Sequence, residues 1–350
     1  MTEIKRIAID TSKSVFTLHG VDAVGRAVLR RNLRRGELLR FFERLPPVEV
    51  ALEACGGSHH WGRALAALGH RVRLIPPQYV KPFVKRSKND RNDAEAIAVA
   101  AAQPSISSVP VKSAEQQAAA MLLSVRELLV RQRTQLVNAM RGHAAELGVV
   151  AALGEKGLRE LQTEIVAADE AAVPAAAKQA IELLGREVER IEGRLRAIEA
   201  ELMQQHKANP LSRRLAAIPG IGPIGALNLA LRVDQTQFAS ARHFAAWLGL
   251  VPRECSTAGR QRLGGISRAG DERLRQLLVL GATAVIQHGN PRVTPAGERP
   301  TGRPATSQWL LNLLSRKPRK LAAVALVNKM ARIVWALMTS GKTYRPAPAA

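Results

Sequence analysis

The chain has 350 residues, of which 52 are Lys or Arg and 29 are Asp or Glu, so its formal net charge is +23. A surplus of this size favours a polyanionic partner, nucleic acid before an anionic membrane surface, over a basic protein that has no such partner. The two cysteines, Cys55 and Cys255, have neither CxxC nor zinc-site spacing, which argues against a thiolate metal site and fits a reducing cytosol.

The first 105 residues have the pattern of an α/β domain. The expected strands are 6–10, 15–21, 26–31, 48–53 and 71–75, with helices at 35–44 and 58–68. Three strands in a meander, followed by strands that alternate with helices, are typical of a ribonuclease-H-like sheet. We therefore expect an N-terminal catalytic domain of this class at 1–105.

Long helices follow a linker at 104–110. Apolar residues spaced at the helical period predict a helix over 113–147, and a heptad pattern follows in Ile181, Leu184, Val188, Ile191, Leu195, Ile198 and Leu202. The heptad predicts a coiled coil, either as a hairpin with the first long helix or across a dimer. An amphipathic helix packed on its own domain fits the pattern equally well. This helical segment is expected at 111–207.

The composition changes again after Leu211, and we expect a mainly α C-terminal domain at 211–343. It contains a tight turn at 218–223, a glycine-rich stretch at 258–270, a mobile loop at 288–304 and a final helix at 320–338. A disordered tail is expected at 344–350. The N-terminus lacks a signal-peptide pattern, and no apolar run reaches the ~18 residues of a membrane helix, so we expect a cytoplasmic protein without a membrane partner.

Four carboxylates stand at positions where chemistry is expected. Asp10 and Glu53 each end an apolar strand, and Asp90 and Asp93 are three residues apart at the start of a helix. Residues with that spacing share a helix face, and the strand ends converge on one edge of such a sheet. A helix that crosses this edge would bring all four acids together.

Four clustered carboxylates raise one another's pKa values unless cations neutralise them. Two Mg²⁺ ions about 4 Å apart would remove this cost and polarise a phosphate. The alternative is a set of unrelated surface acids and helix caps, since an Asp at a helix start is often a cap. An actin-like ATPase is a poorer interpretation, because no glycine follows Asp10 closely and the chain contains no GxxxxGK[ST] motif.

The second half carries candidate phosphate contacts. Gly220 and Gly222 lie in a turn that resembles a helix-hairpin-helix, although a plain turn between helices fits as well. Hydroxyls, glycines and arginines alternate around Ser256, which is a candidate nucleophile or simply the start of a turn. The predicted phosphate-binding arginines are Arg253, Arg260, Arg262 and Arg268.

These motifs together resemble the DEDD transposases of bridge-RNA-guided insertion sequences, a group of serine recombinases related to the pilin-gene inverting recombinase. The matching segments are 9–13 (IDTSK), 53–56 (EACG), 89–94 (NDRNDA), 218–222 (IPGIG), 244–253 (FAAWLGLVPR) and 262–267 (RLGGIS). Each motif is modest, but their joint order is specific and spans almost the whole chain.

The resemblance implies a RuvC-like domain in which Asp10, Glu53, Asp90 and Asp93 hold Mg²⁺. It implies that Ser256, with Thr257 as the alternative, attacks DNA and forms a phosphoserine link. It further implies a structured guide RNA and a dimer or tetramer whose site joins two subunits. Similar proteins have a glycine pair after the two hydroxyls, whereas this chain has Ala258 at the first position.

The sequence therefore predicts an insertion-sequence transposase or site-specific DNA recombinase that needs no ATP. A hydrolytic nuclease such as a junction resolvase would use the same acids and would not require Ser256. A regulator that binds nucleic acid without catalysis would not require the acids.

Overall fold

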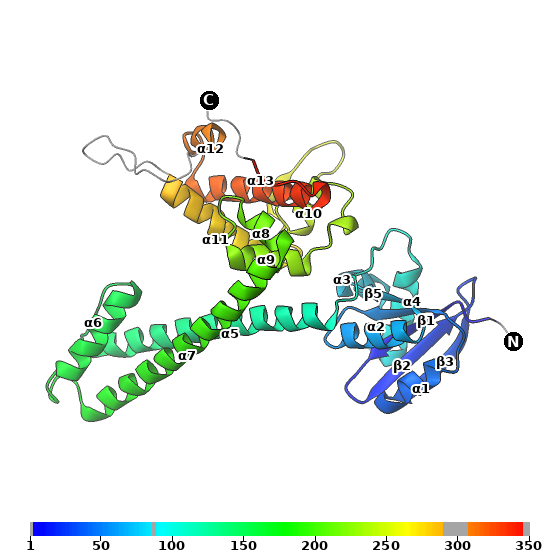
Figure 1. The fold of residues 1–350 in the computed structure, drawn as a ribbon, viewed down its shortest axis with the longest axis horizontal. Coiled ribbons are helices and arrows are strands. Elements are labelled where there is room, and N and C mark those ends of the chain that lie inside the picture. The colour runs from blue at the N-terminus through cyan, green and yellow to red at the C-terminus, as the bar shows by residue number, and fades with distance from the viewer. Residues whose placement is uncertain (1–2, 86–88, 290–306, 346–350) are drawn as a thin grey trace. The chain divides into compact units, whose positions relative to one another are not determined.

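The computed structural model describes residues 3–85, 89–289 and 307–345 (Figure 1). The chain divides into two compact units, Met1–Ala118 and Ala119–Ala350, and each is described by itself. The predicted separation of residues after 110 into a helical segment and a C-terminal domain remains a prediction.

A five-stranded mixed sheet forms the first unit. Its strands lie in the order β3-β2-β1-β4-β5, where β1, β2 and β3 are antiparallel and β1, β4 and β5 are parallel. The bounds are Arg6–Thr11 (β1), Val15–Val21 (β2), Ala27–Arg34 (β3), Glu49–Glu53 (β4) and Arg71–Ile75 (β5). The predicted meander and the two later strands are confirmed, although β3 continues three residues beyond its predicted end.

The two faces of this sheet are covered by different helices. Ile7 and Ile9 are fully buried on the face that packs on α1 (Leu38–Phe42) and α2 (Ser58–Ala67). Ala8 and Ala51 are fully buried on the opposite face, against α4 (Asp90–Ala102). Because side chains alternate along a strand, Asp10 and Glu53 share the face of Ala8 and Ala51, and therefore the side of α4.

Short helical elements fill the remaining connections of the first unit. The predicted helix at 35–44 is a 3₁₀ turn, η1 (Arg35–Glu37), followed by α1. A further pair of short elements, α3 (Pro77–Val80) and η2 (Lys81–Phe83), follows β5.

A long helical hairpin begins the second unit. Its two arms are α5 (Ala114–Glu146) and α7 (Ala175–Ala208), and α6 (Gly154–Ala167), which was not predicted, lies between them in the sequence. The arms are antiparallel, because the ion pairs Arg126–Glu199 and Arg133–Glu192 run in opposite chain directions.

Leucine and isoleucine side chains pack between the two arms. Leu129 contacts the heptad residues Ile191 and Leu195, and Leu123 clusters with Leu202. The predicted heptad therefore faces the first long helix of the same chain. A coiled-coil superhelix, and a contact across a dimer, remain predictions.

The rest of the second unit is mainly helical and contains one small hairpin. The helices are α8 (Pro210–Ala216), α9 (Pro223–Arg232), η3 (Gln235–Gln237), α10 (Ala241–Trp247), α11 (Glu272–Gly289), α12 (Gln308–Leu314) and α13 (Arg319–Ser340). The hairpin consists of β6 (Pro252–Glu254) and β7 (Leu263–Ile266). This hairpin was not predicted, and β7 lies within the glycine-rich stretch expected at 258–270.

Helix α13 forms the centre of this core and corrects one expectation. Val327, Ala331 and Val334 are fully buried among α8, α10 and α11. Among the described residues α13 is one helix long and apolar enough to cross a membrane, so the expectation that no apolar run reaches that length is wrong. Its buried face gives the apolar composition a simpler reason, the core of a helical domain.

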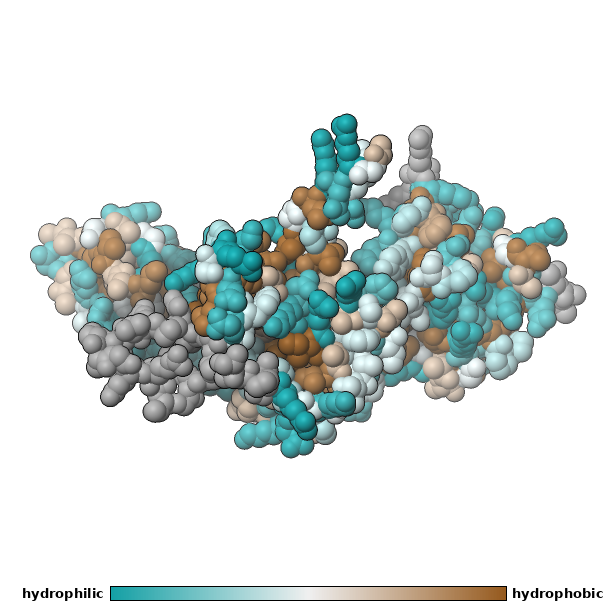
Figure 2. All heavy atoms as spheres, turned by 90° about the horizontal axis from the view of Figure 1, so that it is seen from above, coloured by the Kyte–Doolittle hydropathy of each residue, from teal (hydrophilic) through white to brown (hydrophobic). Residues whose placement is uncertain are grey.

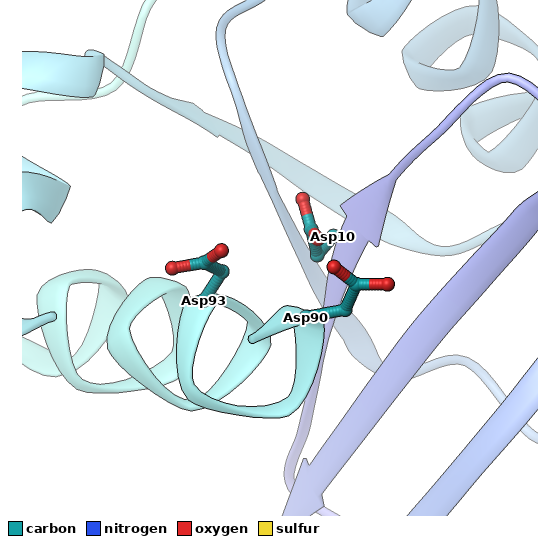
Figure 3. A group of neighbouring side chains, drawn as sticks. All are labelled: Asp10, Asp90 and Asp93. Atoms are coloured by element: carbon teal, nitrogen blue, oxygen red, sulfur yellow. The ribbon is translucent and has the colours of Figure 1, made fainter. Parts of the chain in front are cut away.

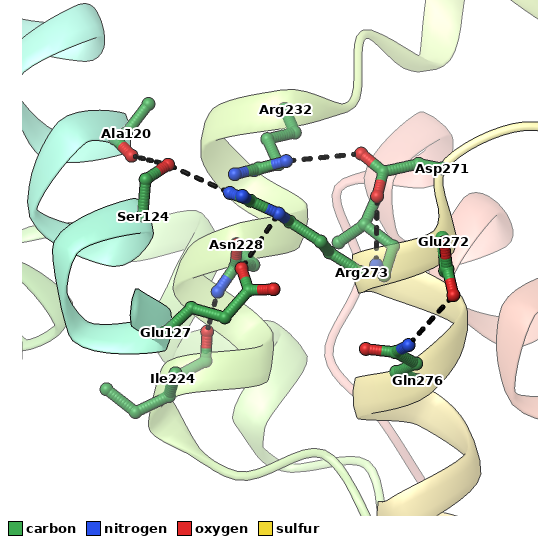
Figure 4. Close-up of polar contacts among 11 residues, drawn as sticks. Ala120, Ser124, Glu127, Ile224, Asn228, Arg232, Asp271, Glu272, Arg273 and Gln276 are labelled. Atoms are coloured by element: carbon green, nitrogen blue, oxygen red, sulfur yellow. Dashed lines mark hydrogen bonds and ion pairs between the residues drawn. The ribbon is translucent and has the colours of Figure 1, made fainter. Parts of the chain in front are cut away.

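A polar junction ties the hairpin arm α5 to α9 and α11 (Figure 4). Arg273 forms an ion pair with Glu127 at 2.7 Å and donates a hydrogen bond to the Ser124 hydroxyl at 2.9 Å. Beside it, Arg232 pairs with Asp271 at 3.3 Å. These contacts fix the base of the α5 arm against the C-terminal helices.

The face of the molecule drawn in Figure 2 exposes hydrophobic residues among hydrophilic ones.

Of the predicted mobile loop, residues 288 and 289 belong to α11, and 290–304 lie outside the described residues. Residues 346–350 of the predicted tail also lie outside them.

Candidate functional site

Three of the four predicted acids meet at one end of the sheet. Asp10, Asp90 and Asp93 each offer a carboxylate oxygen, and these atoms lie within 4.8 Å of one another (Figure 3). Asp10 comes from the end of β1, and the other two come from the first turn of α4. The predicted convergence of strand end and helix start is confirmed for these three residues.

Asn89, and not either aspartate, caps helix α4. Its side-chain oxygen accepts a hydrogen bond from the backbone N–H of Asn92 at 2.9 Å. The carboxylates of Asp90 and Asp93 form no hydrogen bond or ion pair with any residue that the structure describes. The interpretation of these aspartates as helix caps is therefore wrong, and their carboxylates are free to bind a ligand.

Electrostatics distinguish this group from ordinary surface acids. Burial, followed by the negative charges of Asp93, Asp90 and Glu53 in that order, raises the pKa of Asp10 to about 6. Burial, and then the charge of Asp93, also raises the pKa of Glu53. Glu53 lies outside the group of three oxygens, but it is close enough for its charge to act on Asp10.

The donor set fits a hard divalent cation. All the ligand atoms are carboxylate oxygens, which Mg²⁺ prefers, and the described residues place no Lys or Arg in an ion pair with Asp10, Asp90 or Asp93. A divalent ion would neutralise the repulsion that raises the pKa of Asp10. Asp10, Asp90 and Asp93, with Glu53 beside them, are therefore the residues that could hold metal.

The raised pKa of Asp10 predicts that the free energy of unfolding of the metal-free protein falls as pH rises. A carboxyl whose pKa is higher in the folded state stabilises the fold below the unfolded value, near 3.8, and loses that contribution as pH rises through about 6. Asp10→Asn cannot ionise, so its free energy of unfolding should gain about 1–2 kcal/mol over the wild type between pH 4 and pH 8, after discounting for solvent screening.

Denaturant unfolding in EDTA at several pH values measures this gain. Glu43→Gln, an exposed acid of the same unit, is the control and should show no such trend. A difference between wild type and Asp10→Asn that stays constant with pH would contradict the electrostatic account.

Ser256 lies in the loop between β6 and β7, and two neighbours orient its hydroxyl. The Ser256 Oγ donates a hydrogen bond to Glu254 Oε1 at 2.7 Å and accepts one from the backbone N–H of Arg262 at 3.1 Å. The whole residue is exposed. Sequence reasoning missed Glu254; its spacing of two from Ser256, which places both on one side of an extended strand, was the available signal.

The loop conformation favours glycine at both positions that follow the two hydroxyls. Ala258 has φ +48° and Gly259 has φ +76°, so both occupy the left-handed region. A residue with a Cβ pays about 1 kcal/mol there, whereas glycine does not. Ala258 therefore adopts this turn at a modest energetic cost.

The four predicted arginines lie in the hairpin or directly after it in the sequence and are exposed. Arg253 donates a long hydrogen bond of 3.4 Å to the Ser267 carbonyl. The guanidinium groups of Arg260, Arg262 and Arg268 have no hydrogen bond or ion pair within the described part of the chain. They are available to an anion, and their binding to DNA remains a prediction.

The two glycines of the helix-hairpin-helix-like turn have different environments. Gly220 has φ +86°, and a Cβ there would lie 2.8 Å from the Gly281 carbonyl oxygen, so packing against α11 requires glycine at this position. Gly222, directly before α9, has open space around it. Contact with phosphate remains a prediction for both, but packing alone accounts for Gly220.

Two family models and several known proteins that match this chain are all named as transposases. Residues 7–148 match a family model described as "Transposase", the DEDD type of IS110, and residues 212–296 match one described as "Transposase IS116/IS110/IS902 family". The chain is 51% identical to a Sinorhizobium fredii protein named as a transposase, y4pF/y4sB, over 99% of this chain and 87% of that protein. It is 38% identical to the "Transposase for insertion sequence element IS1111A" of Coxiella burnetii, over 99% of this chain and 92% of that protein.

These matches correct one part of the resemblance. Both family models are transposase models, and the N-terminal one is named for its acidic residues, so the designation of the family as serine recombinases is at odds with them. Neither model bears on which side chain attacks DNA. The DEDD assignment of the N-terminal half is supported, and with it a ribonuclease-H-like α/β fold. The chain belongs to the IS116/IS110/IS902 family of insertion-sequence transposases and is a DNA transposase.

Proposed function

We propose that this transposase cuts and rejoins DNA by transesterification at a RuvC-like carboxylate site. The convergence of Asp10, Asp90 and Asp93 within 4.8 Å is the observation that carries the proposal. Glu53 completes the set from the end of β4. When bound, two Mg²⁺ ions would polarise the scissile phosphate and stabilise the oxygens that enter and leave.

Ser256 is the nucleophile in this proposal. Its Oγ is held by Glu254 and by the backbone of Arg262, whereas no hydrogen bond to the side chain of Thr257 exists among the described residues. Arg260 and Arg262 would hold the phosphate oxygens, since guanidinium groups bind them in a bidentate manner. The phosphoserine link conserves the energy of the phosphodiester bond, so rejoining requires no ATP.

The assembly is proposed from charge and resemblance. A net charge of +23 suits a complex with DNA and a structured guide RNA. A dimer or tetramer in the cytoplasm would join the carboxylates of one subunit to the serine of another. Purifying the protein under native conditions and sequencing the bound nucleic acid tests the guide: a discrete RNA encoded beside the gene is expected, and random cellular RNA would contradict it.

Strand exchange on DNA that carries the joined ends of the element tests the function itself. With Mg²⁺, the transposase should produce recombined strands and a transient protein–DNA adduct. A hydrolytic nuclease would leave nicks with free ends and no adduct. A regulator would bind the DNA without cutting it.

A further inference from the structure

The hydroxyl of Ser256 has a carboxylate in contact with it, and this contact bears on how the serine becomes reactive. A serine hydroxyl is a weak nucleophile until a base removes its proton. We propose that Glu254 is that base and is therefore a further catalytic residue. This inference rests on the proposed role of Ser256 as nucleophile.

The directions of the two hydrogen bonds fix the position of the proton. Arg262 donates its backbone N–H to the Ser256 Oγ at 3.1 Å, so this contact occupies a lone pair of the oxygen. The Oγ–H of Ser256 points to Glu254 Oε1 at 2.7 Å, a length typical of a hydroxyl that donates to a carboxylate. The second lone pair of Oγ remains for attack on phosphorus.

Nothing else among the described residues engages the Glu254 side chain. It forms no ion pair there, although Arg253, Arg260 and Arg262 lie in the same hairpin. A carboxylate with a purely structural role in such a basic hairpin would be expected to pair with one of these guanidinium groups. Glu254 instead contacts the proposed nucleophile, within the 2.6–3.2 Å that general-base catalysis requires.

The proposed step balances without any co-reactant. The proton of Ser256 Oγ moves to Glu254 Oε1 as the Oγ–P bond forms and the bond from phosphorus to a deoxyribose oxygen breaks; the departing oxygen takes a proton from solvent. In the rejoining step a deoxyribose hydroxyl gives its proton to solvent as it attacks phosphorus, the Oγ–P bond breaks, and the protonated Glu254 returns its proton to Oγ.

Glu254→Gln tests the proposal, because glutamine keeps the size of the side chain and an oxygen that accepts the hydrogen bond but cannot take up a proton. The rate of adduct formation should fall about 10²–10⁴-fold, the usual contribution of a general base. DNA affinity should not change. Glu272→Gln is the matched control, since the Glu272 carboxylate of the same unit accepts a side-chain hydrogen bond only from Gln276 among the described residues, and its rate should equal that of the wild type.

The pH dependence distinguishes proton transfer from a structural role. Above pH 7 the wild-type rate should be flat, whereas the Glu254→Gln rate should rise about tenfold per pH unit, because hydroxide must then remove the serine proton. Glu254→Asp, which keeps a carboxylate, should retain the flat profile. A wild-type rate in Glu254→Gln, or a slow rate that stays flat with pH, would overturn the proposal.

The same assay separates this inference from the proposed function. If Ser256→Ala still forms the adduct, the serine is not the nucleophile and both ideas fail. If Ser256→Ala removes the adduct while Glu254→Gln reacts at the wild-type rate, only the role of Glu254 fails.

Discussion

Asp10→Asn is expected to abolish DNA strand cleavage while leaving DNA binding intact. The substitution removes a half-buried carboxylate at the centre of the cluster, and with it a charge that attracts a divalent ion. Metal ions contribute several kcal/mol to phosphoryl transfer, and each 1.36 kcal/mol corresponds to a tenfold change in rate, so the loss should reach about 10³-fold or more. Cleavage of end-labelled DNA in Mg²⁺, together with a binding titration, measures both properties.

Glu43 is an exposed acid of the same unit to which no role is assigned. The Glu43→Gln variant loses one negative charge and should cleave DNA at the wild-type rate. Glu53→Gln should behave like Asp10→Asn if Glu53 joins the metal site. Cleavage by Asp10→Asn within tenfold of the wild type would show that the cluster is structural, as in a non-catalytic DNA-binding regulator.

Ser256→Ala is expected to remove the covalent protein–DNA adduct completely. Alanine has no oxygen with which to form a phosphoester, and the Oγ that it lacks is the atom held by Glu254 and Arg262. A denaturing gel of reactions with labelled DNA detects the adduct directly. Substrate binding should be unchanged, because the arginines of the hairpin remain.

Thr257→Ala is the matched control for the neighbouring hydroxyl. The adduct should form normally in this variant, since only the backbone of Thr257 takes part in described hydrogen bonds, with Arg260. An adduct that persists in Ser256→Ala and disappears in Thr257→Ala would reassign the nucleophile. Cleavage without an adduct in the wild type would favour the hydrolytic nuclease.

Local signals in the sequence were sufficient to predict the carboxylate end of the sheet. Apolar runs that end in Asp10 and Glu53 predicted β1 and β4, and the spacing of Asp90 and Asp93 predicted a shared helix face. Strand alternation then places the two strand acids on the side of α4. The capping role of Asn89 was also readable, because Asn followed by a helical pattern is a common helix start.

The second half was harder to predict because its structure depends on tertiary packing. The hairpin of β6 and β7 has exposed, arginine- and glycine-rich strands without the alternation that marks a half-buried strand. Helix α6 carries its apolar residues Leu158, Leu161 and Ile165 at helical spacing, but it is short and lies between alanine-rich segments. Gly220 is required because its backbone packs against Gly281, which lies 61 residues later in the chain. No local sequence pattern predicts this contact.

A calorimetric titration of the protein with Mn²⁺ in the absence of DNA tests the central claim that Asp10, Asp90 and Asp93 are metal ligands. The wild type and Glu43→Gln should bind the ion with the same saturable isotherm, and Asp10→Asn and Asp93→Asn should lose that binding. Identical isotherms for the wild type and both aspartate variants would contradict the carboxylate site and everything proposed for it.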